Sequence, residues 1–528
     1  MILLVGQARL FELADRDEAV AAIYLAHLRQ PQDRHLSAMF SSETSVRVAL
    51  AGRVMIEQCD LFVAVWDGAS GAQVGGTGHT LRAALEAGAQ VVWIDARSPD
   101  RIRLLQGTES LTVPPAPLAG EELAAVLKTL VQRALRPVPG KHGVEKDPLG
   151  SEPWPQNSRP LWHAYRRIEA LFGASKWGER FRDLTQTYET PDAVARGSGA
   201  DLLAATATLP GLDPEAASGI ESNVLRRFAW ADGVSAWRSD VYRGGMTANF
   251  VLAALAIVGG ILYLPLGRAH GKWAFALFEL LLLAFILGVT LVGQKRRWHG
   301  RWFETRRAAE YLRHAPIMML LGVSRAPGRW PQGTDTSWPE WYSRHAVREA
   351  GLPRLAVTEP YLRAALQSLL LPHVTRQRDY HLGKARRLAT AHHNLDRLAE
   401  RMFLLAIVCV SGYLGLKLGG VLHLWPKAWA EHSSLWFSFF GVLLPTFGGA
   451  LAGIRYFGDF ERFSAISRVT AEKLQVIHGR ISRLLESPAG AMDYGLVADL
   501  AHATDEVVVS EIESWQSVFG GKHVTVPV

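Results

Sequence analysis

The residues with the clearest chemical meaning form a glycine-rich segment behind a short apolar run. Leu61–Trp66 ends at Asp67 and Gly68, and the loop continues to Gly75, Gly76, Thr77, Gly78, His79 and Thr80. Glycines allow close approach of a phosphate or ribose, and a helix starting near Thr80 offers free N–H groups and a positive dipole end. The segment predicts a site for a nucleotide-type ligand, with Asp67 as a ribose- or base-contacting carboxylate. The alternative is a glycine-capped structural turn that Asp67 helps to form.

Two strand-like runs and a helix would position this loop. Leu61–Trp66 and Gln90–Asp95 are short and apolar, and Thr80–Gly88 between them has helix-forming residues and ends at a glycine. Strand, loop, helix and strand in close succession are typical of a βαβ unit. We therefore expect a Rossmann-like α/β domain over residues 1–112.

Four apolar segments further along predict membrane-spanning helices. They are Met246–Leu266, Trp273–Gly293, Met402–Leu424 and Leu435–Ile454. At ~1.5 Å per residue, each is long enough to cross a hydrocarbon layer of ~30 Å. Their only Asp, Glu, Lys or Arg residues are Glu279 and Lys417. An acidic residue at that depth predicts either a pore or gate element or a carboxyl group held between helices, so Glu279 is a pore candidate.

The basic residues indicate how these segments are oriented. The net charge is +7, and Lys and Arg gather before the first and third spans and after the second and fourth. Because positive residues stay on the cytoplasmic side, both hairpins should begin and end there, with both termini in the cytoplasm. The charge is thus explained by a lipid bilayer as partner, and we do not expect nucleic acid. Two cysteines exclude a disulfide framework, and no His or Cys spacing predicts a metal site or a further cofactor.

Composition divides the chain into seven parts. The parts are the α/β domain (1–112), a Pro-rich linker (113–160), a helical connector (161–245), the first hairpin (246–293), a cytoplasmic helical region (294–401), the second hairpin (402–454) and C-terminal cytoplasmic helices (455–528).

The sequence also suggests an internal duplication. Trp298 and Arg306-x-x-Ala309-Glu310-x-Leu312 match Phe460 and Arg468-x-x-Ala471-Glu472-x-Leu474 at identical offsets. Chance similarity would explain this match equally well.

Several strings resemble a known family. Ala51-Gly52-Arg53, Cys59-Asp60-Leu61, Trp66-Asp67-Gly68, Gly75-Gly76-Thr77 and Val91-Val92-Trp93-Ile94 resemble the SLOG superfamily of Rossmann-like nucleotide-ligand domains. The membrane half is similar to the SLATT-type effectors that accompany such sensors in bacterial antiphage systems. The resemblance covers the stretch from Ala51 to Ile94 and, more loosely, the membrane half. It implies a multi-pass protein of the bacterial inner membrane.

The loop departs from the enzymes of that superfamily. They resemble Pro-Gly-Gly-x-Gly-Thr-x-x-Glu here, whereas this chain has Val74, His79 and Arg82 in place of the proline, threonine and glutamate. Replacing the carboxylate by a guanidinium removes the group that assists hydrolysis and favours an anionic ligand. No catalytic residue is therefore predicted. The expected ligand-binding residues are Asp67, Gly68, Gly75, Gly76, Thr77, Gly78, Thr80 and Arg82.

These observations favour one function over two alternatives. The expected protein is a membrane effector whose cytoplasmic domain binds a nucleotide-derived signal and opens or assembles an ion-leak pathway. Four helices enclose little water, so a homo-oligomer is implied. The first alternative is a membrane-anchored enzyme that cleaves the N-glycosidic bond of NAD or another nucleotide. The second is a non-catalytic membrane scaffold.

Overall fold

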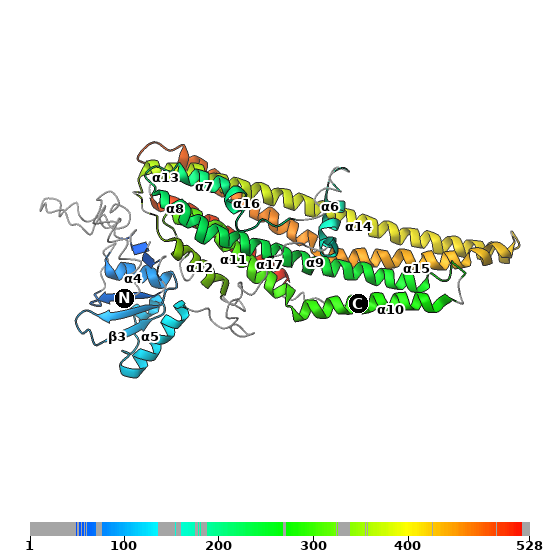
Figure 1. The fold of residues 1–528 in the computed structure, drawn as a ribbon, viewed down its shortest axis with the longest axis horizontal. Helices are drawn as coiled ribbons and strands as arrows, with labels where there is room; N and C mark the ends of the chain where they lie inside the picture. Colours follow the sequence, from blue (N-terminus) through cyan, green and yellow to red (C-terminus); the bar gives the residue numbers. More distant parts are fainter. Residues whose placement is uncertain are drawn as a thin grey trace.

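The protein is mostly helical, with a small α/β domain at one end of a long helical body and two hairpins at the other (Figure 1). The computed structural model describes residues 61–69, 76–135, 160–174, 187–267, 271–323, 338–353, 357–424, 426–492 and 494–519, with isolated residues between these ranges and from 49 to 59. Within these residues, four helices are long and apolar enough to cross a membrane. The predicted membrane class is confirmed at this level.

The α/β domain contains the expected βαβ unit. Strands β1 (Phe62–Trp66) and β2 (Val91–Asp95) are parallel, with Phe62 opposite Val91, and α4 (Thr77–Glu86) connects them. In the described residues the sheet is small and mixed, with three strands in the order β1-β2-β3. Strand β3 (Ile102–Leu105) pairs antiparallel to β2, because a tight turn closed by Arg101 N–H donating to the Ser98 carbonyl brings the chain straight back. So short a connection cannot make the crossover that a parallel strand needs.

Part of the expected linker is a helix. After the 3₁₀ turn η2 (Thr108–Leu111), α5 (Gly120–Leu135) packs Val126, Leu127 and Leu130 against the sheet. Helix α4 packs on a separate core cluster that includes Phe62 and Trp93. The apolar residues of α5 recur at helical spacing, a signal that the prolines at 114, 115 and 117 obscured.

The helical body is built from two units with the same order of elements. The first contains α8 (Pro214–Ile220), the π-helix η6 (Glu221–Leu225), α9 (Arg226–Ile261), α10 (Lys272–Lys295) and α11 (Trp298–Leu320). The second contains α13 (Glu359–Ala365), the π-helix η9 (Leu366–Leu370), α14 (Leu371–Val421), α15 (Lys427–Gly458) and α16 (Phe460–Leu485). In both units the long helix begins directly after the π-helix.

The junction that follows each hairpin strengthens the case for duplication. Arg297 (φ 48°, ψ 42°) precedes α11, and Asp459 (φ 46°, ψ 38°) precedes α16. The left-handed conformation is uncommon for residues other than glycine, yet it occurs here at the same place in both units. Each of these residues is followed by a buried aromatic side chain, Trp298 or Phe460. The two units therefore share a backbone feature as well as a sequence pattern.

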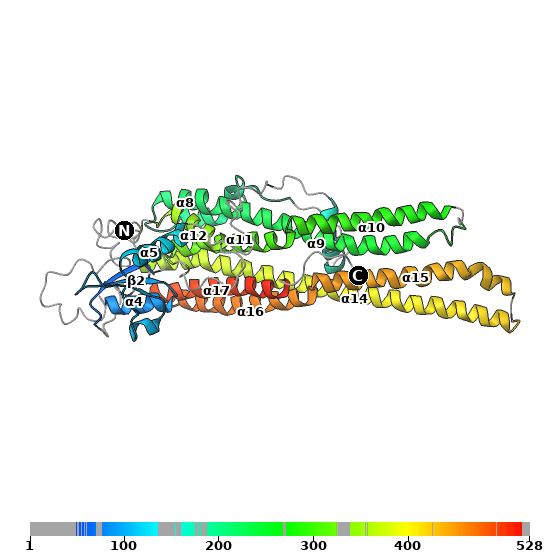
Figure 2. The same cartoon turned by 90° about the horizontal axis from the view of Figure 1, so that it is seen from below.

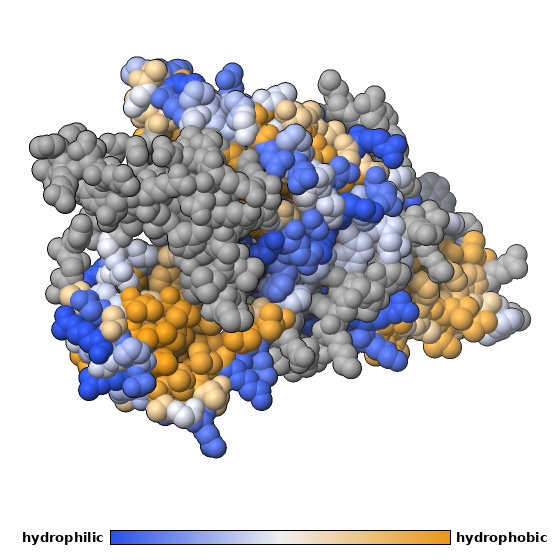
Figure 3. Space-filling view, turned by 60° about the vertical axis from the view of Figure 1, so that its left-hand side comes forward, coloured by the Kyte–Doolittle hydropathy of each residue, from blue (hydrophilic) through white to orange (hydrophobic). Residues whose placement is uncertain are grey.

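The two hairpins lie side by side and differ in length (Figure 2). From the start of the long helix to the left-handed junction, the second unit is longer than the first, and its hairpin projects further from the body (Figure 1). Helix α9 contacts both α10 and α15, and α15 also packs on α14. The hairpin end is predominantly hydrophobic at the surface, whereas hydrophilic residues cover much of the middle of the body (Figure 3).

Further helices complete the helical body. They are η3 (Pro160–His163), α6 (Ala164–Gly173), η5 (Val194–Arg196), α7 (Ala200–Ala207), α12 (Trp338–Ala350) and α17 (Tyr494–Phe519). One core cluster joins α11, α13, α14, α16 and α17. A second, the aromatic layer, lies at the base of the hairpins and consists of Tyr165, Tyr242, Trp298, Trp302, Phe457, Phe460 and Phe463 with their aliphatic neighbours.

We predict that Gly244 is needed for the packing of α9 at this layer. A Cβ added to Gly244 would collide with the Trp162 carbonyl oxygen, whereas one added to Gly383 of α14 would meet nothing within 4 Å. Gly244→Ala should therefore destabilise the protein by about 1–3 kcal/mol. Gly383→Ala should be neutral or stabilise by up to about 1 kcal/mol. Thermal unfolding in detergent measures both, and equal midpoints for the two variants would contradict the prediction.

Candidate functional site

Within the described residues, the N-terminus of α4 has no side-chain cap that would exclude an anion. Gly76 is the N-cap residue and provides no side-chain cap, and the first turn carries no acidic residue. The Thr80 N–H donates to the Gly76 carbonyl at 3.0 Å, and Thr77 is exposed. Free N–H groups and the positive dipole end make such a terminus suitable for a phosphate or a carboxylate.

Asp67 forms part of the turn after β1. Its Oδ1 accepts a hydrogen bond from the Ala69 N–H at 3.0 Å, and its Oδ2 lies 3.5 Å from an Arg97 Nη atom. Gly68 has φ +77°, which favours glycine at that position. Asp67 therefore helps to form the turn, and its carboxylate faces a cation. Sequence reasoning missed Arg97, which follows β2 and reaches Asp67 because parallel strands end at the same edge of a sheet.

Two tryptophans form an aromatic wall beside this turn. The rings of Trp66 and Trp93 are 5.2 Å apart at 47°, and the Trp93 indole N–H donates to the Trp66 carbonyl at 2.9 Å. A Cβ on Gly78 would lie 3.4 Å from the Trp66 ring. Gly78 thus allows the ring to lie against the first turn of α4, which joins the end of β1 to the helix N-terminus. Arg103 lies over Trp93 at 4.9 Å.

The predicted site residues do not all meet at this point. Asp67, Gly68, Gly76, Thr77 and Gly78 surround the junction of β1 and α4. Thr80 is half-buried on the side facing Gly52, where an added Cβ would lie 3.0 Å from its Oγ1. Arg82 is exposed in the second turn of α4, and Gly75 lies outside the described residues.

Glu279 lies between the two helices of the first hairpin. It is half-buried, and its Oε2 rests where a Cβ on Gly260 of α9 would be. Another polar contact in this hairpin is the hydrogen bond from Asn249 Nδ2 to Thr290 Oγ1, 3.1 Å long and fully buried. The arrangement matches a carboxyl group held between helices more closely than one that faces lipid.

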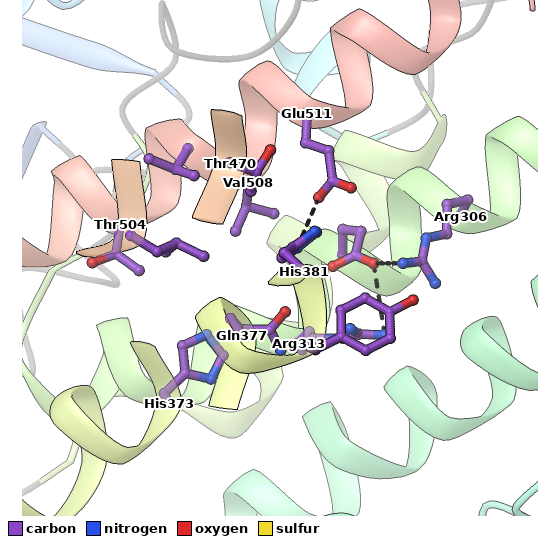
Figure 4. Close-up of a pocket in the computed structure, with 13 residues that line it drawn as sticks. Arg306, Arg313, His373, Gln377, His381, Thr470, Thr504, Val508 and Glu511 are labelled. Carbon is purple, nitrogen blue, oxygen red and sulfur yellow. Dashed lines mark ion pairs between the residues drawn. The ribbon is translucent and has the colours of Figure 1, made fainter. Parts of the chain in front are cut away.

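A second polar site lies inside the helical body. Glu310 of α11 pairs with Arg306 and lies 3.6 Å from Arg313, and both arginines also contact Asp232 of α9. Across a small cavity between α11, α14, α16 and α17, His381 Nε2 is 3.4 Å from a Glu511 oxygen (Figure 4). The free space of ≈ 10 Å³ is enough for about one water molecule. The cavity is too small for a nucleotide. The charged residues around it therefore form a structural ionic cluster.

Local spacing indicates only part of this ionic cluster. Arg306 and Glu310 stand at i,i+4 spacing, whereas Asp232, His381 and Glu511 come from distant segments. Burial alone would raise the pKa of Glu310, but Arg306 and Arg313 outweigh it and lower that pKa. The carboxylate is therefore charged at neutral pH. In the part of the chain that the structure describes, no group of three His, Cys, Asp or Glu side chains could hold a metal ion.

Comparison with known proteins adds no relative. The chain matches no family model, no curated protein and no solved structure. The resemblance to SLOG and SLATT proteins therefore rests on the motifs quoted above, and any ligand must be argued from the residues themselves.

We predict that Glu310 is strongly stabilising and that its counterpart in the second unit is not. Glu472 occupies the equivalent position of α16 but is exposed. Glu310→Ala removes the buried counter-charge of Arg306 and Arg313. This change should lower the free energy of unfolding by about 3–5 kcal/mol. Glu472→Ala should change stability by less than about 0.5 kcal/mol. Chemical unfolding in detergent compares the two, and similar losses would contradict a special role for the buried cluster.

We also predict a loss of stability in mild acid. Burial lowers the pKa of His314, His373 and His381 below the ordinary value of 6.5. These side chains are neutral in the folded state but take up protons near pH 6.5 once unfolded, so stability is full above pH 6.5 and falls below it. Each can contribute up to about 1.4 kcal/mol per pH unit. Unfolding midpoints from pH 7.5 to 5.5 test this, and His373→Gln should flatten the dependence; a flat profile for the unmodified protein would refute it.

Proposed function

We propose that this protein is a membrane effector in which a cytoplasmic α/β domain binds a nucleotide-derived signal and controls an ion-leak pathway through the membrane helices. The ligand would lie over the Asp67–Gly68 turn and the N-terminus of α4, with Trp66 and Trp93 beside it. A role in bacterial antiphage defence is part of this proposal and derives from the family resemblance. The expectation of a Rossmann-like sensor also belongs to it.

The observation that carries the proposal is the continuity between the hairpins and the helical body. Helix α9 has 36 residues and α14 has 51, and each continues from the core of that body into an apolar segment. A helix as long as α14, with its 51 residues, extends for ~77 Å. Any rearrangement of the cytoplasmic ends must therefore move the membrane segments. A ligand can shift such an equilibrium by the difference between its affinities for the two arrangements.

Exposure of the membrane helices supports the homo-oligomer. Only 17% of the apolar window of α10 is buried, 11% of that of α14 and 22% of that of α15, against 56% for α9. With α9 between α10 and α15, the four helices leave most of their apolar surface to lipid or to further copies. A water-filled path would be formed between copies rather than inside one.

The proposal predicts nucleotide-dependent ion flux that an acidic residue at the α4 N-terminus abolishes. Protein in liposomes would be tested with NAD, ADP-ribose and nucleoside monophosphates, with thermal shift as the binding measurement. Thr77→Asp should weaken binding at least about tenfold, because a carboxylate there competes with an anionic ligand. Thr129→Asp, at an exposed position of α5, is the matched control.

Two outcomes would overturn this function. Absence of flux with every nucleotide, at concentrations where thermal shift reports binding, would contradict the ion-leak pathway. Sustained cleavage of NAD that Asp67→Ala abolishes would instead support the enzyme. Equal effects of Thr77→Asp and Thr129→Asp would remove the α4 N-terminus as the binding site.

A further inference from the structure

Glu304 of α11 is a buried carboxylate that joins two separate parts of the protein. Its side chain is 8% exposed. The indole N–H of Trp338 in α12 donates to its Oε2 at 3.0 Å, and an Arg297 Nη group donates to its Oε1 at 3.1 Å. Hydrogen bonds to a buried charged group are among the stronger ones in proteins, so this carboxylate holds both partners firmly.

One of those partners is the left-handed residue at the base of the first hairpin. Arg297 separates α10 from α11, and its backbone accepts the first bond of α11, from the Arg301 N–H at 2.9 Å. The second unit has no such arrangement, because Asp459 and Ile466 stand at the positions of Arg297 and Glu304. The carboxylate contact is therefore specific to the first hairpin and is not a general requirement of this junction.

The other partner belongs to a helix that reaches the α/β domain. Arg344 of α12 donates to the Cys59 carbonyl at 3.4 Å, just before β1. Towards the body, Glu340 of the same helix forms a buried ion pair with Arg307 of α11. Trp338 packs against Ala231, Ala308 and Ala309. Helix α12 thus contacts the α/β domain through one set of residues and Glu304 through another.

We propose that α12, Glu304 and Arg297 form a latch through which the α/β domain regulates the first hairpin. In the arrangement described, Trp338 fixes the Glu304 carboxylate, which in turn holds the Arg297 side chain against α11. Displacement of α12 with the α/β domain would release Arg297 and free the base of α10. This inference deepens the proposed function and rests on it for the nature of the signal, but the latch itself can be tested without ligand.

Trp338→Phe is the variant that removes the donor and keeps most of the ring. Its matched control is Trp341→Phe on the same helix, because the Trp341 indole N–H has no hydrogen-bond partner within the described structure. Hydrogen exchange in lipid nanodiscs would follow the amides of Arg296, Arg297 and Arg301, which are bonded to the carbonyls of Val292, Gln294 and Arg297. We expect Trp338→Phe to speed their exchange about tenfold and Trp341→Phe to leave it unchanged.

The outcomes separate the latch from simple packing and from the proposed function. Glu304→Gln, which keeps the shape but loses the charge, should also speed exchange at these amides. Unchanged exchange in Trp338→Phe, or an equal rise in Trp341→Phe, would overturn the latch. The result does not depend on flux or nucleotide binding, so a latch could be found in a protein that conducts no ions. If the protein does conduct, Trp338→Phe should raise flux without ligand, and unchanged flux would argue against regulation through the latch.

Discussion

The guanidinium of the half-buried Arg243 lies among the rings of the aromatic layer and joins the two units of this protein. Its guanidinium carbon lies 5.0 Å from the Tyr165 ring, 4.6 Å from Trp302, 5.4 Å from Phe463 and 5.5 Å from Trp515. These rings come from α6, α11, α16 and α17, while Arg243 belongs to α9, so one side chain contacts elements of both units at the base of the hairpins. A cation among aromatic faces is worth more when water is excluded. The layer also buries both residues that follow the left-handed junctions, and so sets where each membrane helix ends.

The two units follow the same path but have different surroundings. Their π-helices, long helices and left-handed residues occur in the same order. The side chains diverged according to what packs on them. Glu310 lies in an ionic cluster covered by α14 and α17, whereas Glu472 is exposed on α16. Glu304 contacts α12, whereas its counterpart Ile466 packs into the aromatic layer. The first hairpin is therefore connected to the α/β domain in a way that the second is not.

Local patterns could predict much of this architecture. The long apolar segments and the βαβ unit follow from hydropathy and strand length, which do not depend on distant residues. Two features differ from the prediction. The short turn after β2 makes the sheet mixed rather than parallel. The prolines that precede α5 favoured a linker, although the apolar residues of α5 have helical spacing. At the candidate site, Asp67 and the glycines were identified from their order, but Arg97 and the Trp66–Trp93 pair required the register of β1 on β2.

The sequence by itself determined the elements whose stability is local: four helices long enough for a membrane, and a glycine-rich turn ahead of a helix. It also contained the repeated Arg and Glu spacing on α11 and α16. Only the tertiary structure decided which copy of that spacing is buried, which carboxylate joins α12 to the hairpin, and how Asp67 is paired. The physical reason is that burial, counter-charges and hydrogen-bond partners come from segments distant in the chain, and hydropathy and spacing along a single segment carry no information about them.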